Sequence, residues 1–519
     1  MSGDMPGIRL LLPLLSLITA AGATFRFASY YGHHMVLQQK PAHALVWGYG
    51  EVGAQITVSL LRGMETVLKG AVIINDVGTW KVLLNPMDFG GPYHLVAQQN
   101  YKQENTSIHL DDILFGDVWI CSGQSNMEMT VSQIFNASSE LAKASHYPNV
   151  RLFTAALVTA DVELPDLAKV DLAWSVPTAQ NLGQGAFTYF SAVCWLFGRR
   201  LARRLKYPIG LVESSWGGTP VEAWSSKTAL AKCGLSETGQ DVTQSFESSD
   251  WIGGPCVYSV LWNAMIHPLL NMTIKGAIWY QGEANTGMNT NLYNCTFPNL
   301  IKDWRRSFHE GSKGQTDPNF PFGFVQLSTY QKGVLKDNFP EIRWHQTADY
   351  GYAPNHMMPN TFMAVAMDLC DETSPYGSIH PRDKQTVAYR LSLGARAIAY
   401  GERDVSFKGP FPVTIDVYYD YSYMNITYDQ DLLITHTCDK IFEVLCSNNK
   451  DEESYFWVPV PATLIASSSK VVTVAFKGCP HISGVRYAWS DWPCEYKQCP
   501  IYSVRHGLPA PLFIKYFQK

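Results

Sequence analysis

A serine that follows an apolar segment is the first residue that could carry covalent chemistry. Ser125 lies in the run CSGQSNMEM (residues 121–129), directly after the apolar residues 117–121. Beside Gly123, such a serine can occupy a tight strand-to-helix turn that exposes Oγ and points backbone N–H groups at a developing oxyanion. The pattern differs from G-x-S-x-G, because Met127 takes the last position. Capping of a helix is the alternative role for a serine here.

A histidine in a later loop could supply the base that a serine needs. His380 lies in the run DETSPYGSIHPRDK (residues 371–384), which follows another apolar segment. A serine hydroxyl is inert without a group that takes its proton. The alternative is that His380, one of 14 histidines, only caps the helix that follows.

Two further runs could stabilise an oxyanion. Paired glycines, Gly217 and Gly218, lie in SSWGGTP (residues 214–220) and let a backbone N–H approach a ligand closely. Gln281, in WYQGEAN (residues 279–285), could add a side-chain amide donor. The alternatives are a plain turn and a buried amide that satisfies backbone groups.

Together these runs resemble the SGNH hydrolase superfamily and, within it, the sialate O-acetylesterases. The matching blocks occur in the family's order, and a further block near the start also matches: GQSNM (123–127), WGGTPVEAW (216–224), YQGE (280–283), IHPRDK (379–384) and HMVLQQ (34–39). The resemblance covers essentially the whole mature chain. The length and secretory features resemble those of the vertebrate lysosomal members.

The resemblance implies a role for each matching residue. Ser125 would be the nucleophile and His380 the general base. The backbone N–H of Ser125, that of Gly217 or Gly218, and the side chain of Gln281 would form the oxyanion hole.

The resemblance also implies roles for two carboxylates and a substrate. Glu283 and Glu222 would order the loop or contact sugar hydroxyls. The implied substrates are O-acetylated sialic acids and sialoglycoconjugates, with hydrolysis chiefly at the 9-hydroxyl through an acetyl-Ser125 intermediate. No metal and no organic cofactor is implied.

One departure from the superfamily concerns the acid that orients the histidine. The superfamily places Asp three residues before its His, and this chain has Gly377 there. Either another acid orients His380, with Asp371, Asp368 or Asp383 as candidates, or a backbone carbonyl does so and the site is a Ser–His dyad.

Two other functions remain open. One is a related acetyl esterase that acts on other glycans. The second is a sugar-binding protein that keeps the fold but lacks turnover; the missing Asp motivates it, and 15 Trp and 27 Tyr would suit sugar stacking. Labelling by an organophosphonate separates the classes, because only an activated serine reacts.

The elements that must position these residues alternate between strands and helices. We expect strands at 117–121, 208–213, 275–280, 322–327 and 363–367, and helices at 190–205 and 387–400. This order predicts an α/β fold with a parallel sheet covered on both faces. The resemblance makes it an SGNH-hydrolase-like (flavodoxin-like) three-layer sandwich. Ser125, Gly217, Gln281 and Asp368 closely follow strand ends, where such sheets bind ligands.

Composition changes along the chain predict its division. We expect a signal peptide at 1–23, an N-terminal β-sandwich-like domain at 24–111, a catalytic α/β domain at 112–402 with an exposed insertion loop at 231–257, and a C-terminal β-rich, Cys-rich region at 403–519. The run GYGEVG (48–53) matches a dinucleotide fingerprint formally. Because residues 54–60 continue as a strand, it is interpreted as a turn.

Several features predict a secreted or lysosomal glycoprotein. Arg9, the apolar residues 10–20 and the small residues 21–23 are typical of a cleaved signal peptide, and no membrane anchor is expected. Sequons occur at Asn105, Asn136, Asn271, Asn294 and Asn425. The 11 cysteines allow disulfides and leave at least one thiol outside an intrachain pair.

The charge balance excludes a nucleic-acid-binding class. The chain carries 40 Lys plus Arg against 45 Asp plus Glu, a formal net charge of −5. The densest basic run, GRRLARRLK (198–206), has its apolar residues on one helical face, so its arginines are interpreted as a solvated face.

Overall fold

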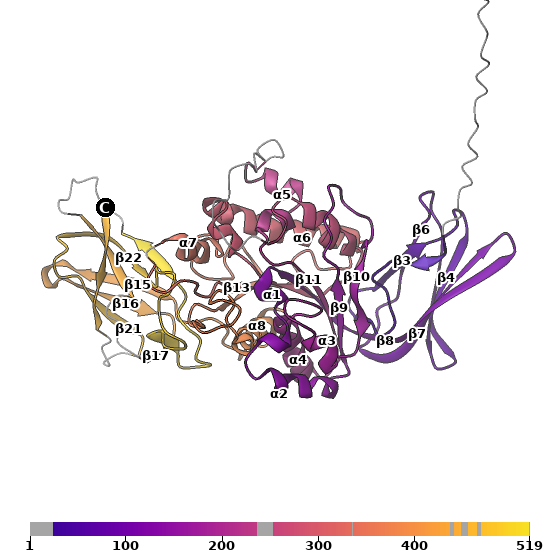
Figure 1. Ribbon diagram of the computed structural model, residues 1–519, viewed down its shortest axis with the longest axis horizontal. Helices are drawn as coiled ribbons and strands as arrows, with labels where there is room; N and C mark the ends of the chain where they lie inside the picture. The colour runs from indigo at the N-terminus through magenta and orange to yellow at the C-terminus, as the bar shows by residue number, and fades with distance from the viewer. Residues whose placement is uncertain are drawn as a thin grey trace, which may run out of the picture.

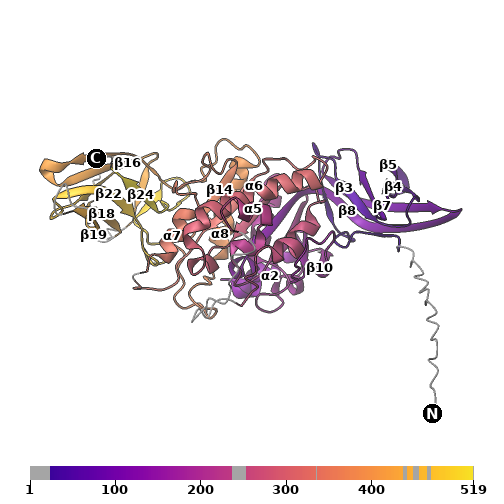
Figure 2. The same cartoon turned by 90° about the horizontal axis from the view of Figure 1, so that it is seen from above.

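The computed structural model describes residues 24–235, 253–334, 336–435, 441–447, 455–463 and 469–517. The predicted signal peptide lies outside these residues, as does most of the predicted insertion loop. The molecule is elongated, with a helix-rich middle part and β-rich parts at both ends (Figure 1). The same arrangement is evident from above (Figure 2).

The middle part is built on strands in the order β10-β9-β11-β8-β12-β13-β14. All neighbours in this order are parallel except β9 and β10. Each of the five predicted strands overlaps one of them. The strands are β8 (Glu104–Gly123), β9 (Val150–Ala155), β10 (Val170–Ser175), β11 (Ile209–Ser215), β12 (Gly276–Tyr280), β13 (Phe322–Gln326) and β14 (Thr361–Val365).

Helices lie on both sides of these strands. In Figure 1, α5 (Lys227–Ala231) and α6 (Tyr293–Gly311) lie above them, and α4 (Ala192–Leu205) and α8 (Lys384–Ile398) lie below. The two predicted helices are α4 and α8. The remaining α-helices are α1 (Ser125–Glu128), α2 (Ala137–Ala142), α3 (Ala179–Gly183) and α7 (Asn338–His345).

The local sequence explains why α4 begins and ends where it does. The Ser191 side chain caps its first turn by accepting the N–H of Cys194, and Lys206 ends it in the left-handed conformation. A disulfide between Cys121 and Cys194 joins the helix to β8, four residues before Ser125. The start of α4 is therefore fixed to the strand that carries the candidate nucleophile.

The N-terminal part shares strand β8 with the middle part. The first half of β8 pairs antiparallel with β7, and its last residues pair with β11 and β12. The predicted boundary between residues 111 and 112 therefore falls inside one continuous strand, because the two parts share a sheet. The other strands are β1 (Arg26–Phe27), β2 (Val36–Gln38), β3 (Leu45–Tyr49), β4 (Gln55–Arg62), β5 (Glu65–Ile73), β6 (Thr79–Leu83) and β7 (Gly90–Tyr101).

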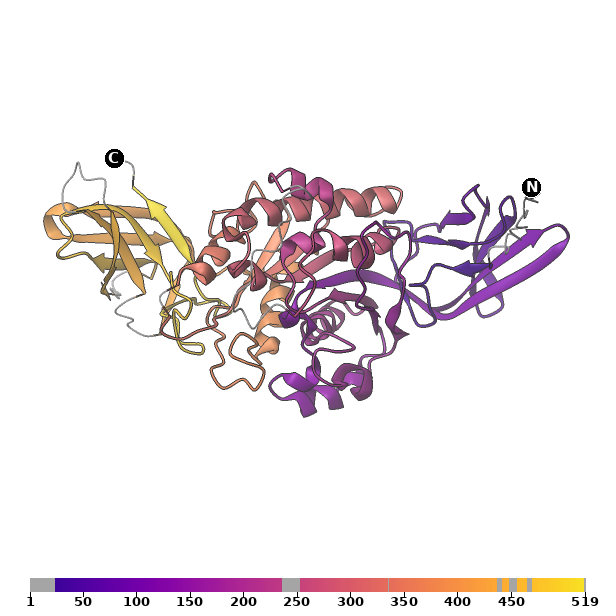
Figure 3. The same ribbon diagram turned by 45° about the horizontal axis from the view of Figure 1, so that its top comes forward.

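The C-terminal part packs around a second core, which also includes Val365 and Met367 of the middle part, whereas the other two parts share one core. Figure 3 shows it at the opposite end of the molecule from the N-terminal strands. Its strands are β15 (Pro412–Tyr418), β16 (Tyr423–Tyr428), β17 (Leu432–Ile434), β18 (Phe442–Ser447), β19 (Phe456–Val460), β20 (Ala462–Thr463), β21 (Val471–Ala475), β22 (His481–Tyr487), β23 (Ile501–Ser503) and β24 (Phe513–Tyr516).

Disulfides occur in the middle and C-terminal parts. Besides Cys121–Cys194, the pairs are Cys233–Cys295, Cys446–Cys479 and Cys494–Cys499. Cys256 and Cys370 are unpaired, and Cys438 lies outside the described residues. Within the described ranges, no helix has the length and apolar character that a membrane span requires.

The five sequons differ in exposure. Asn105 and Asn136 are exposed. Asn271, Asn294 and Asn425 are half-buried, and each side chain already has a hydrogen-bond partner.

Candidate active site

Ser125 is the first residue of α1, directly after β8. The turn that positions it requires glycine at position 123, where φ is +140°. A Cβ there would lie 2.1 Å from the carbonyl oxygen of Tyr280, because β8 and β12 approach each other closely. As a first-turn residue, Ser125 has an N–H that the helix itself does not use. This is the strand-to-helix turn that the sequence predicted.

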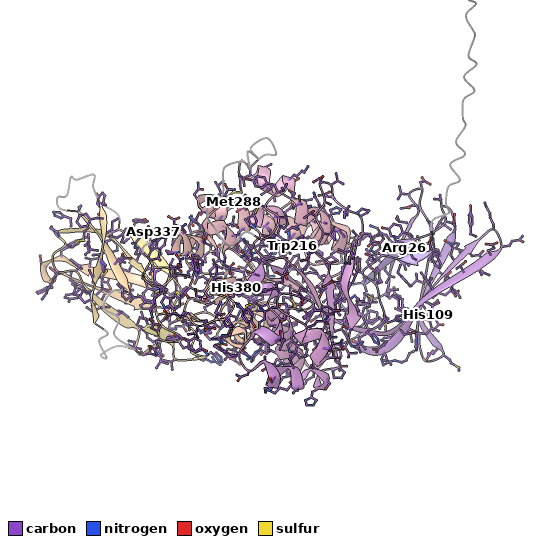
Figure 4. All side chains as sticks on the ribbon, viewed as in Figure 1. Arg26, His109, Trp216, Met288, Asp337 and His380 are labelled. Carbon is purple, nitrogen blue, oxygen red and sulfur yellow. A yellow bond between two sulfur atoms is a disulfide. The ribbon has the colours of Figure 1, made fainter. Side chains whose placement is uncertain are left out.

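His380 lies in the middle of the molecule (Figure 4), and its ring contacts the serine. Its Nε2 is 2.8 Å from Ser125 Oγ, and its Nδ1 is 2.7 Å from the carbonyl oxygen of Tyr376. Because a carbonyl only accepts, Nδ1 carries the hydrogen and Nε2 presents its lone pair to the hydroxyl. Gly377, with φ +84°, allows the turn that brings the Tyr376 carbonyl back to the ring.

The surroundings keep the imidazole uncharged. Burial lowers the pKa of His380 to about 4; the hydrogen bond to Tyr376 opposes this shift, and the ammonium of Lys384 adds to it. His380 is therefore a free base over most of the physiological pH range.

The candidate orienting acids do not contact His380. Asp371 accepts two hydrogen bonds from the Arg382 guanidinium, at 2.7 and 2.8 Å. Asp383 caps α8 by accepting the N–H of Thr386, and it also accepts the Tyr496 hydroxyl. Of the alternatives that the sequence left open, the structure has the backbone carbonyl.

Asp368 follows β14, as expected, but it too is used elsewhere. Its carboxylate is buried and forms a two-pronged ion pair with Arg390 of α8, at 2.6 and 2.8 Å. This pair fastens α8 to the end of β14.

One expected oxyanion donor is not available in the structure. The amide of Gln281 donates both hydrogens within the protein, to the carbonyl of Thr219 at 3.1 Å and to Oδ1 of Asn285 at 2.8 Å. Its oxygen accepts the hydroxyl of Tyr293. In this structure Gln281 has the contacts of the buried amide of the alternative interpretation, and it holds adjacent loops together.

Gly217 does lie beside the serine, but its N–H already has a partner. A Cβ at Gly217 would lie 3.2 Å from Cβ of Ser125, so the backbone of this glycine packs directly against the serine. Its N–H donates to Oε2 of Glu128 at 2.8 Å. The next residue, Gly218, has φ +70° and completes the turn.

Glu128 is the main feature of the site that the sequence did not assign. It lies one turn after Ser125 on α1, and burial raises the pKa of its carboxyl to about 7. The hydrogen bond from Gly217 opposes this rise. A second carboxyl, Glu213 on β11, is fully buried nearby, and burial raises its pKa well above the usual value. Glu128 belongs to the run CSGQSNMEM (residues 121–129), but its position in that run does not reveal the contact with Gly217.

Glu222 and Glu283 are interior residues in the structure. Glu222 accepts the amides of Asn285 and Asn289, at 2.9 and 3.0 Å. Glu283 accepts the amide of Asn126 at 2.6 Å. Burial raises both pKa values. Two roles were considered for these carboxylates: ordering the loop and contacting sugar hydroxyls. The observed contacts support the first role and give no support to the second.

A buried polar network joins the two halves of the site. Asn126 donates to Glu283 and to the carbonyl of Ile379, and its Oδ1 accepts Nζ of Lys384 at 2.6 Å. Burial lowers the pKa of Lys384 to about 7. The network connects α1, the loop after β12 and the His380 loop. All its members lie in motif blocks, but only the structure shows their contacts.

The site can perform acyl transfer. It contains a hydroxyl hydrogen-bonded to a neutral, oriented imidazole, and backbone N–H groups lie beside that hydroxyl. Among the residues that the structure describes, no group of three or more His, Cys, Asp or Glu is placed to hold a metal ion.

Comparisons with known proteins agree with this geometry. The family described as "Carbohydrate esterase, sialic acid-specific acetylesterase" matches residues 115–380, and the "Sialate O-acetylesterase C-terminal domain" matches residues 414–517. The sialate O-acetylesterase of Homo sapiens is 53% identical over 517 residues, covering 98% of this chain and 97% of that protein. The Mus musculus protein of the same name is 52% identical over 535 residues, covering 99% and 98%.

A solved structure extends the similarity to three dimensions. The crystal structure of a carbohydrate acetylesterase from Xanthomonas citri superposes with a TM-score of 0.75 at 26% identity, covering 94% of this chain and 99% of that one. The similarity thus includes the β-rich parts at both ends.

Proposed function

The chain belongs to the sialic acid-specific acetylesterase family of carbohydrate esterases, and on this premise we propose that it removes O-acetyl groups from sialic acids, chiefly from the 9-hydroxyl. It is a carboxylic ester hydrolase. The observation that carries the proposal is the 2.8 Å contact between Ser125 Oγ and the neutral His380 ring.

The reaction proceeds in two halves. Nε2 of His380 takes the proton of Ser125 as Oγ attacks the acetyl carbon, and the same proton then passes to the departing sugar oxygen. The C–O bond to the sugar breaks, leaving acetyl-Ser125. A water molecule, deprotonated by His380, attacks this ester and releases acetate, and Ser125 regains its proton.

The histidine works without a carboxylate partner. The Tyr376 carbonyl holds the Nδ1 hydrogen, and so fixes the tautomer and the direction of Nε2. The imidazolium that forms during the reaction is stabilised by this dipole rather than by a full negative charge. Asp371 and Asp383 act through structure, by anchoring Arg382 and capping α8.

Two backbone groups stabilise the oxyanion in this proposal: the N–H of Ser125 and that of Gly217. Gly217 is shared with Glu128, so the charge of that carboxyl matters. An ionised Glu128 holds the N–H firmly and repels the oxyanion. A neutral Glu128 releases the N–H more easily and has a proton that it can itself donate. The active form therefore has Glu128 protonated and His380 neutral.

The test is acetate release from 9-O-acetylated sialic acid by the wild type and by Ser125→Ala, measured side by side. Release by the wild type only supports both the reaction and the nucleophile. Release by both would exclude Ser125 as nucleophile. If a folded wild type releases none, an organophosphonate decides between the alternatives: labelling of Ser125 favours an esterase for another acetylated glycan, and no labelling favours a sialoglycan-binding protein.

The finer points of architecture and location belong to the same proposal. We infer an SGNH-type, flavodoxin-like three-layer catalytic domain at 112–402, between a β-sandwich-like domain at 24–111 and the C-terminal region at 403–519, with residues 1–23 removed as a signal peptide. The disulfides support passage through the secretory pathway to the lysosome or the outside. The substrates there are sialoglycoconjugates.

A further inference from the structure

A hollow of about 410 Å³ lies where the segment after β13 meets the C-terminal part. Trp489, Trp492 and Pro459 contribute apolar surface, while Asp337, Glu443 and Arg486 contribute charged groups. Figure 4 shows Asp337 on the side of the middle part that faces the C-terminal strands. The size falls within the range of small-molecule sites, and aromatic walls with a few polar groups are typical of them.

The two tryptophans that line the hollow each have an indole donor without an acceptor among the described residues. The indole Nε1 atoms of Trp489 and Trp492 are buried and have no partner among the described residues. Buried donors in folded proteins are nearly always paired, because an unpaired one loses its hydration without compensation. The two indoles therefore keep hydrogen-bonding capacity that no described residue uses.

An ion pair holds one of the tryptophans in position. Arg486 of β22 binds Glu443 of β18 through two hydrogen bonds, at 2.7 and 3.0 Å. The same guanidinium lies over the ring of Trp489, at 5.2 Å, and over that of Trp457, at 4.4 Å. The pair is close to neutral overall, yet it offers both donors and acceptors. This combination suits vicinal hydroxyls, and the indole faces suit the C–H face of a sugar ring.

Hydrogen bonds connect the hollow to the catalytic loop. The carboxylate of Asp491, between the two tryptophans in sequence, accepts the N–H groups of Tyr330 and Gln331, at 2.8 and 3.0 Å. The carbonyl of Tyr330 accepts the hydroxyl of Ser378 at 2.6 Å, two residues before His380. The hollow is therefore held in a fixed position relative to the His380 loop.

We propose that this hollow binds a neutral sugar of the glycan chain that carries the acetylated sialic acid. The proposal rests on the proposed function for its link to the reaction. It makes the C-terminal part a contributor to substrate selection: the glycan is held by Trp489 and Trp492 while its terminal sialic acid reaches Ser125.

The kinetic test compares two substrates on three variants. The substrates are free 9-O-acetylated sialic acid and a 9-O-acetylated sialyl trisaccharide. Trp489→Ala and Trp492→Ala should each lower kcat/KM for the trisaccharide by about tenfold, or ~1.4 kcal/mol, while changing that for the monosaccharide less than twofold. The matched control is Trp457→Ala, which removes the other ring that Arg486 lies over, one that does not line the hollow, and should leave the preference unchanged.

Three results would overturn the proposal. The first is an equal loss on both substrates, which indicates a structural role. The second is the same selective loss in Trp457→Ala, and the third is no loss in either hollow variant. If the alanine variants do not fold, Asp337→Ala, at the exposed rim, replaces them and should raise KM for the trisaccharide only.

A binding test stands apart from catalysis. The probe is a non-acetylated sialyl trisaccharide, titrated into the full-length Ser125→Ala protein and followed by NMR. The expected result is tighter binding of the trisaccharide than of free sialic acid, and loss of this difference on adding Trp489→Ala. Equal binding of both sugars would refute the proposal that the hollow binds a neutral sugar. If the wild type releases no acetate from either substrate, the proposed function fails. This titration still shows whether the hollow binds a neutral sugar.

Discussion

Replacing Glu128 with glutamine should extend esterase activity to higher pH. The N–H of Gly217 donates to Oε2 of Glu128 at 2.8 Å, and burial raises the pKa of this carboxyl to about 7. Below that pH the carboxyl is neutral, and above it an anion occupies the place next to the developing oxyanion. Glutamine keeps the shape and remains neutral, so the loss at high pH should disappear.

The size of the effect follows from the geometry. An oxyanion that accepted the N–H of Gly217 would lie about 4 Å from the carboxylate, where two like charges repel by about 4 kcal/mol near a protein surface. This corresponds to a loss of ~10²–10³-fold, the same range as loss of one oxyanion donor. Wild-type kcat/KM should fall about tenfold per pH unit above pH 7, towards that limit.

The acid side of the profile should be the same in both proteins. His380 must be neutral to act, and its pKa is lowered to about 4, so activity should fall only as the pH drops through about 4. The wild type is therefore expected to have a bell-shaped profile between about 4 and about 7. Lys384 adjoins His380 and Glu213 adjoins Glu128. Both of these titratable groups remain in the variant.

The assay is acetate release from 9-O-acetylated sialic acid between pH 3.5 and 8.5, with Ser125→Ala as the blank. Glu213→Gln serves as the control, because it removes the other buried carboxyl near Glu128, whose pKa burial also raises, without touching the N–H of Gly217, and it should leave the alkaline limb in place. An alkaline limb in Glu128→Gln identical to that of the wild type would refute the reasoning. So would a loss of more than tenfold at pH 5.

Three other perturbations have clear expected outcomes. Asp371→Asn and Asp383→Asn should each retain kcat within tenfold, whereas a triad acid would cost ~10⁴-fold; a larger loss with unchanged thermal stability would restore one of them as the acid. Gly123→Ala places a Cβ 2.1 Å from the carbonyl of Tyr280, so circular dichroism and acetate release should show a destabilised and inactive protein, and normal activity would contradict the strict glycine requirement. Removing the disulfide with Cys121→Ala and Cys194→Ala, which closes a separation of 73 residues, should lower unfolding free energy by about 2–5 kcal/mol; an unchanged denaturant midpoint would exclude that contribution.

The sequence predicted the placement of the site well, because that placement depends on strand order. Ser125, Gly217 and Gln281 follow β8, β11 and β12, which are neighbours in the sheet, so apolar runs and their ends were enough to bring them together. The Ser125–His380 contact itself came from motif order and the need of a serine for a base.

Hydrogen-bond partners within the loops were beyond reach of the sequence. Gln281 is close to the site, but its amide is used by Thr219 and Asn285, which no periodicity reveals. Tyr376 orients His380 through a carbonyl, a group that every residue possesses and that therefore leaves no sequence signal. The Glu128–Gly217 contact joins residues 89 positions apart, and only the fold brings them together.

The domain boundary predicted between residues 111 and 112 falls inside a strand for a different physical reason. The change from β-rich to alternating composition near residue 111 is real, but strand β8 runs through it, because one strand can pair with different partners along its length. A domain boundary was therefore expected where the structure has the longest strand among its described residues.

That strand imposes an order of assembly on the newly synthesised chain. Its first half finds β7 as soon as both have left the ribosome, but residues 117–123 need β11, which ends at Ser215. At roughly 5–20 residues per second, these 92 residues take about 5–18 s. During this interval the apolar stretch before Ser125 is unpaired, and Cys121 has no partner until Cys194 is made 73 residues later. We expect this interval to be the point in biosynthesis at which chaperones and disulfide isomerases engage the chain, before the catalytic centre exists.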